Sequence, residues 1–137
     1  MLNKKQVQHL YEYALLEVQK DLGNGITSDE QLNKYCKFLP KFKGAHAFDK
    51  IPKLKNLESC IANLDTSNEP GSHWVALYQY KNKTYMFDSF DRKISHFRRV
   101  DIDKAVMQKP KENDCGQRCI SFLALIASIG LSNTLKL

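Results

Sequence analysis

A chain of 137 residues buries roughly two thirds of its unfolded surface, enough for one core, so we expect a single domain over residues 1–137. The 21 basic and 15 acidic side chains give a net charge of +6, which fits contact with polyanions but is also common in small soluble proteins. The four cysteines show neither CxxC pairs nor the density of a secreted disulfide scaffold, and the segment MLNKKQVQHLYEY lacks the apolar core of a signal peptide. We therefore expect reduced thiols in an intracellular protein, and no membrane contact because no apolar run reaches the length of a bilayer span.

The first predicted elements are two helices. Residues 4–22 place their apolar side chains on one face at helical spacing, and Gly23 interrupts the pattern. Ser28 and Gln31 have the spacing of a capping box before a second apolar segment, which Pro40 ends. Both patterns indicate amphipathic helices that bury one face.

Strands are predicted in the middle of the chain. Residues 40–57 show no clear periodicity, whereas 59–64, 73–80 and 83–89 are short apolar stretches with the composition of strands. The last two are separated by a polar Lys-Asn-Lys turn, which predicts a hairpin. Residues 94–107 fit either a strand or a short helix.

A polar loop and an apolar helix close the pattern. The stretch QKPKENDCGQRC (108–119) begins as a loop, and CISFLALIASIG, from residue 119, continues an apolar run that predicts a helix over 115–129. Together the elements predict an α+β fold in which this buried helix packs against a mostly antiparallel sheet.

The predicted hairpin brings a histidine and an acid to one face. An even-numbered loop makes paired residue numbers sum to an odd value, which places Asp88 on the same face as His73. A sum of 161 makes the two directly opposed, whereas with 163 or 165 Asp88 faces Val75 or Leu77, and contact requires the strands to splay or bend.

These residues suggest nucleophilic catalysis. A carboxylate at Asp88 would fix the tautomer of His73 and leave its other ring nitrogen to exchange a proton with Cys115. At a helix start, unpaired amides favour the thiolate form of cysteine. The Cys115 amide and the Gln108 side chain are candidate oxyanion donors, and Gly116 would leave room for a substrate backbone.

The ordered signals GSHWVALY, YMFDSF, Gln108 and DCG resemble adenain-like viral cysteine proteases and their relatives among the SUMO proteases. The similarity covers roughly residues 27–129. It implies an adenain-like fold, catalytic residues His73, Asp88, Gln108 and Cys115, and a groove near Trp74 and Gly116 that accepts small residues.

The resemblance also implies partners. The expected substrates are viral precursor polypeptides at glycine-rich sites, cleaved by a monomer in the virion or in the host nucleus or cytoplasm, with no required cofactor. The resemblance to this family implies regulation by an activating peptide that is linked to a cysteine between the acid and the glutamine, but residues 89–107 contain no cysteine. Linkage of an activating peptide to Cys36 or Cys60, a non-covalent activating peptide, and assistance by DNA stay open.

Other classes remain alternatives. Each residue alone has a simpler structural role: Cys115 or Cys119 as a small buried group, Trp74 as core, Asp88 as a turn residue. Zinc bound by His73, Asp88, Cys115 and Cys119 is chemically conceivable but lacks closely paired ligands. A SUMO or ubiquitin-like isopeptidase and a catalytically inactive binding module are the two other readings of the same residues.

Overall fold

The computed structural model describes residues 1–64, 73–89, 93–96 and 114–137. Among these residues it contains three α-helices: α1 (Lys4–Leu22), α2 (Asp29–Tyr35) and α4 (Cys115–Thr134). Two short 3-10 helices follow α2 and β1, at Cys36–Phe38 (η1) and Phe48–Lys50 (η2). The strands are β1 (Phe42–Ala47), β2 (Ser59–Asn63), β3 (Trp74–Tyr80), β4 (Lys83–Asp88) and β5 (Lys93–His96).

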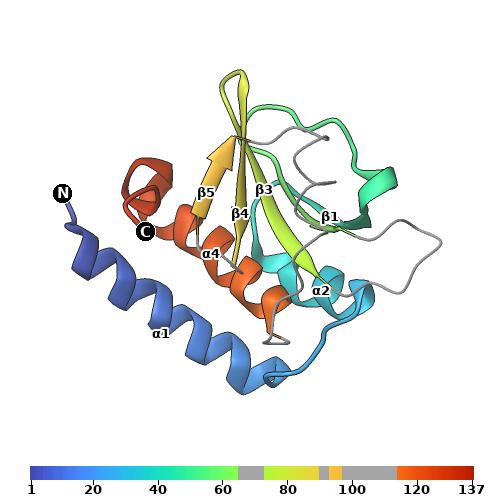
Figure 1. The fold of residues 1–137 in the computed structure, drawn as a ribbon, viewed down its shortest axis with the longest axis horizontal. Coiled ribbons are helices and arrows are strands. Elements are labelled where there is room, and N and C mark those ends of the chain that lie inside the picture. The colour runs from blue at the N-terminus through green and yellow to red at the C-terminus, as the bar shows by residue number, and fades with distance from the viewer. Residues whose placement is uncertain (65–72, 90–92, 97–113) are drawn as a thin grey trace.

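The strands form one sheet in the order β1-β2-β3-β4-β5. Strands β1 and β2 are parallel, and every other neighbouring pair is antiparallel. The predicted α+β class with a mostly antiparallel sheet is therefore confirmed. Figure 1 shows α4 beside the sheet and α1 along the outer side of α4.

The helix predictions are correct in their starts and less so in their ends. Helix α1 has the predicted bounds, and the Ser28–Gln31 capping box is present at α2. The second helix was expected to continue to Leu39, but after Tyr35 the chain tightens into η1. Helix α4 runs past its expected end, although Gly130 has a left-handed φ of 83° that kinks it there.

Residues 40–57 hold more structure than their sequence indicates. They contain β1, whose residues are mostly half-buried, so that no apolar alternation marks the strand. The Ala45 amide of β1 donates a hydrogen bond to the side-chain oxygen of Asn33 in α2, at 2.8 Å. The segment 94–107 contains the end of β5, which agrees with the strand alternative over residues 94–96.

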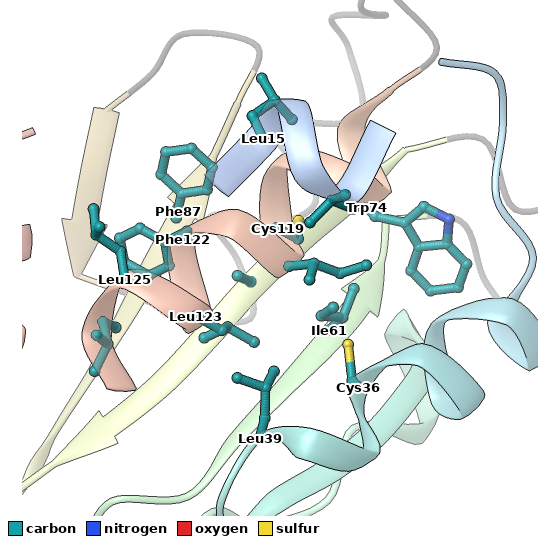
Figure 2. Packing of buried hydrophobic residues seen from close by; sticks show 14 of the residues in the cluster. Leu15, Cys36, Leu39, Ile61, Trp74, Phe87, Cys119, Phe122, Leu123 and Leu125 are labelled. Atoms are coloured by element: carbon teal, nitrogen blue, oxygen red, sulfur yellow. The ribbon is translucent and has the colours of Figure 1, made fainter. Parts of the chain in front are cut away.

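The main core lies between the sheet and the two long helices. Phe87 of β4 stacks on Phe122 of α4 with ring centroids 4.6 Å apart, and Tyr11 of α1 meets the edge of Phe87. Figure 2 shows Phe87, Phe122 and Leu15 in this layer, with Cys119 beside them. A second apolar cluster lies on the other face of the sheet, under residues 48–54, and consists of Cys60, Ala62, Leu64, Val75, Leu77 and Met86.

Helix α4 corrects the expectation that no apolar segment has the length of a bilayer span. It has 20 residues and, by length and composition alone, is apolar enough to cross a membrane. Most of the segment is buried inside the domain, between α1 and the sheet. Its place in the core accounts for its apolar composition.

Candidate functional site

His73 and Asp88 form a buried hydrogen-bonded pair. His73 directly precedes β3, and Asp88 is the last residue of β4. The imidazole Nε2 lies 2.8 Å from Asp88 Oδ1, with side chains only 5% and 11% exposed. The pair lies at the end of the sheet where α4 begins, so the two strands deliver an imidazole and a carboxylate next to a helix N-terminus.

The strand register shows how the pair forms. Paired residues of β3 and β4 run from Tyr80–Lys83 to Ala76–Phe87, so their numbers sum to 163. Asp88 is therefore offset by two residues from His73 on the same face. A diagonal neighbour of this kind lies within reach of longer side chains, and both residues lie beyond the last pair of the ladder.

The electrostatics of the site favour a charged histidine. Burial alone would lower the pKa of His73, but the Asp88 carboxylate and then the Cys115 sulfur outweigh it and raise the pKa to about 9. Nδ1 is buried and reaches no hydrogen bond within the described part of the chain. Nε2 is thus occupied by Asp88, while Nδ1 is the ring nitrogen left for proton exchange.

Cys115 lies at the first position of α4, next to β3. The backbone N–H of Trp74 donates to Cys115 Sγ at 3.3 Å. A backbone donor and the amide ends of a helix both stabilise negative charge on sulfur. Strand β3 and helix α4 are therefore joined at the Cys115 sulfur.

All four cysteines are free and buried, and the thiols of Cys36, Cys60 and Cys119 have raised pKa values. Burial raises the pKa of Cys36 and Cys60 to about 12, and that of Cys119 well above its ordinary value. These three remain protonated at neutral pH, and Cys119 packs in the core as expected.

Trp74 and Gly116, the predicted substrate contacts, both pack against the segment before α2. Trp74 is 4% exposed, and its indole N–H donates to the Thr27 carbonyl at 3.0 Å. A Cβ at Gly116 would overlap the Thr27 hydroxyl, which gives this position a packing reason for glycine. Contact of either residue with substrate stays a prediction.

The remaining sequence-derived candidates concern Gln108 and zinc. Gln108 lies outside the residues that the structure describes. Within the described ranges, no group of three His, Cys, Asp or Glu side chains has an arrangement that could hold a metal ion. The structure thus brings together His73, Asp88 and Cys115.

Two residues of the site were not singled out from the sequence. Asp114, directly before Cys115, is buried and accepts hydrogen bonds from Gln19 and Arg118. Gln117 is fully buried, and its side-chain amide donates to the carbonyls of Gly23 and Gly25. Gln117 lies in the polar stretch QKPKENDCGQRC, next to Arg118, so no sequence signal indicates that its side chain is buried.

Comparisons of the chain with protein-family models, with curated proteins and with solved structures gave no significant match.

The charge state of His73 gives a pH prediction. Its ordinary pKa is 6.5 and its folded value is about 9, so its contribution to stability is complete below about pH 6.5 and is lost as the pH rises through 9. We expect the imidazole NMR signals of His73 to titrate near pH 9, which corresponds to roughly 3 kcal/mol of stabilisation of the charged form. A midpoint at or below 6.5 would mean that burial outweighs the interactions of His73 with Asp88 and Cys115. In Asp88→Asn the midpoint should fall, because the principal attraction is removed.

Proposed function

We propose that the chain is a cysteine endopeptidase in which Cys115 is the nucleophile and His73 the general acid and base. The observation that carries this proposal is the convergence of three groups from three elements. His73 Nε2 lies 2.8 Å from Asp88 Oδ1. The backbone N–H of Trp74, the residue after His73, donates to the Cys115 sulfur. Three groups in this order of contact fit the requirements of thiol acyl transfer.

The first half of the reaction forms a thioester. The Cys115 thiolate attacks the carbonyl carbon of the scissile bond, and the carbonyl oxygen takes the negative charge. The oxyanion is held by the Cys115 amide and, in this proposal, by the Gln108 side chain. When the C–N bond breaks, His73 gives a proton to the leaving amine, and the thioester remains on Cys115.

The second half restores the enzyme. Neutral His73 accepts a proton from a water molecule as the water oxygen attacks the thioester carbonyl. The C–S bond breaks, the carboxylic acid product leaves, and Cys115 and His73 return as thiolate and imidazolium. Asp88 keeps Nε2 occupied in both halves, so that only Nδ1 exchanges protons.

The order of these groups along the chain supports an adenain-like assignment within this class. The proposed fold family is adenain-like, and the proposed substrates are viral precursor polypeptides cut after small residues. The preference for glycine rests on the sequence resemblance. The structure adds no support from Trp74, because its side chain is buried and its indole N–H is hydrogen-bonded to the Thr27 carbonyl. We propose that short extended Gly-Gly-type or Gly-Ala-type sites are sufficient for cleavage.

A comparison of substrates tests this function. Values of kcat/KM would be measured for an unstructured peptide with a Gly-Gly-type or Gly-Ala-type site and for full-length SUMO and ubiquitin fusions. We expect cleavage of the peptide with no large gain from a folded modifier. A strong preference for a fusion, beyond its tail sequence, would instead assign the chain to the isopeptidase branch.

Thiol labelling separates an enzyme from an inactive binding module. An electrophile such as iodoacetamide should modify Cys115, at the start of α4, much faster than Cys36, Cys60 and Cys119, because burial raises the pKa of these three thiols. Peptide mapping by mass spectrometry after short exposure measures the four rates. Equal rates at all four cysteines, with no cleavage of any substrate, would support the binding module.

A further inference from the structure

The connection between α1 and α2 lies against the first turn of α4. Gln117 of that turn is fully buried, and its side-chain nitrogen donates to Gly23 O at 2.7 Å and to Gly25 O at 2.9 Å. These two hydrogen bonds from one buried amide hold the first turn of α4 in a fixed position relative to the connection between α1 and α2.

The residue before the nucleophile is held from the same side. Asp114 is 6% exposed, and its carboxylate accepts from Gln19 Nε2 of α1 at 2.9 Å and from Arg118 Nε at 3.0 Å. Asp114 occupies the N-cap position of α4, but its side chain does not cap the helix. The hydrogen bond from Gln19 instead joins the approach to Cys115 to the last turn of α1, and the one from Arg118 joins it to α4 itself.

Thr27, in the same connection, contacts both Gly116 and Trp74. Its hydroxyl occupies the space beside Gly116, and its carbonyl accepts the indole N–H of Trp74 at 3.0 Å. The Trp74 backbone in turn donates to Cys115 Sγ. Residues 19–27 therefore contact the positions before and after Cys115 as well as the residue that donates to its sulfur.

We propose that residues 19–27 form a clamp that positions the Cys115 thiol for reaction, and that Gln117 is its central positioning residue. The inference rests on the proposed function for the reaction that the thiol performs, whereas the placement of the thiol can be measured without that reaction. A shift of about 1 Å in a reacting group lowers rates by up to about a hundredfold, so the clamp acts on reactivity more than on stability.

The main test compares Gln117→Met with the wild-type chain. Methionine keeps the length of the side chain and removes both hydrogen bonds to the glycine carbonyls. We expect iodoacetamide to label Cys115 at least about tenfold more slowly, and kcat for peptide cleavage to fall by a similar factor. KM should change by less than about twofold, because the clamp does not bind substrate.

Two further variants distinguish positioning from general stability. Val7→Ala removes a fully buried side chain from the opposite end of α1, and should lower the unfolding temperature without changing the labelling rate. Gln19→Ala removes the α1 contact to Asp114 from a half-buried position, and should slow labelling even if Gln117→Met does not fold.

The outcomes for the clamp and for the protease are separable. Slow labelling in Gln117→Met and Gln19→Ala, with wild-type labelling in Val7→Ala, supports the clamp even if no peptide is cleaved by any of them. Wild-type labelling in folded Gln117→Met and Gln19→Ala overturns it. Labelling that falls in all three variants in proportion to lost stability overturns it as well, because the role would then be structural only.

Discussion

Cys115→Ala and Cys115→Ser are expected to leave a folded protein with no measurable peptidase activity. The Cys115 sulfur accepts the Trp74 amide N–H and interacts with His73, so either substitution removes the proposed nucleophile. The change is small in volume, and we expect it to cost about 1 kcal/mol of stability or less. Activity would be followed as peptide cleavage and folding as the thermal unfolding midpoint.

Cys119→Ala is the matched control for this experiment. Cys119 lies one helical turn further along α4, is fully buried and packs in the main core. It should lose stability at least as much as Cys115→Ala and keep its activity. Full activity in Cys115→Ala or Cys115→Ser would end the proposed mechanism, and so would a folded but inactive Cys119→Ala.

Asp88→Asn is expected to lower kcat by at least about a hundredfold, because in a serine-protease triad the equivalent loss of charge costs about 10⁴. Asparagine occupies the same space but carries no charge to hold His73 as imidazolium, and its amide can select the wrong ring tautomer. The loss should remain smaller than that of His73→Ala, which removes the proposed general acid and base. KM should change little.

Glu58→Gln serves as the control for the carboxylate. Glu58 directly precedes β2, accepts the Lys55 backbone N–H at 2.7 Å and pairs with Lys43, at the end of β2 opposite to the residue that pairs with Trp74. Its neutralisation should leave kcat unchanged. Equal activity of Asp88→Asn and the wild type would make the Asp88 carboxylate a structural residue only.

The sequence predicts those parts of the fold that local patterns determine. Helix α1 and the capping box of α2 follow from spacing within a few residues, and the helix at Cys115 follows from an apolar run after a polar loop. The pairing of His73 with Asp88 was predicted as an allowed geometry because strand alternation needs only the parity of the loop. The register of 163 depends on the two-residue turn at Lys81–Asn82, which the Lys-Asn-Lys sequence leaves undecided.

The parts that were missed depend on contacts between distant segments. Strand β1 has no apolar alternation of its own, and is defined by pairing with β2 and by the Asn33 side chain. The roles of Asp114 and Gln117 arise from hydrogen bonds to residues more than 90 positions earlier in the chain, at separations of 92 to 95. No local pattern reports such a partner, so only the folded structure shows why a buried glutamine stands in an apolar helix.

The central position of α4 has a consequence for the timing of folding. Helix α1 is synthesised first, yet its buried face packs on α4, about a hundred residues later in the chain. During synthesis the apolar face of α1 and one face of the β2–β4 sheet therefore lack their partner until α4 has left the ribosome. Long-range closure of this kind slows folding and leaves the nascent chain in need of protection. It also means that the hydrogen bond between the Trp74 amide and the Cys115 sulfur forms only once α4 has packed on the sheet.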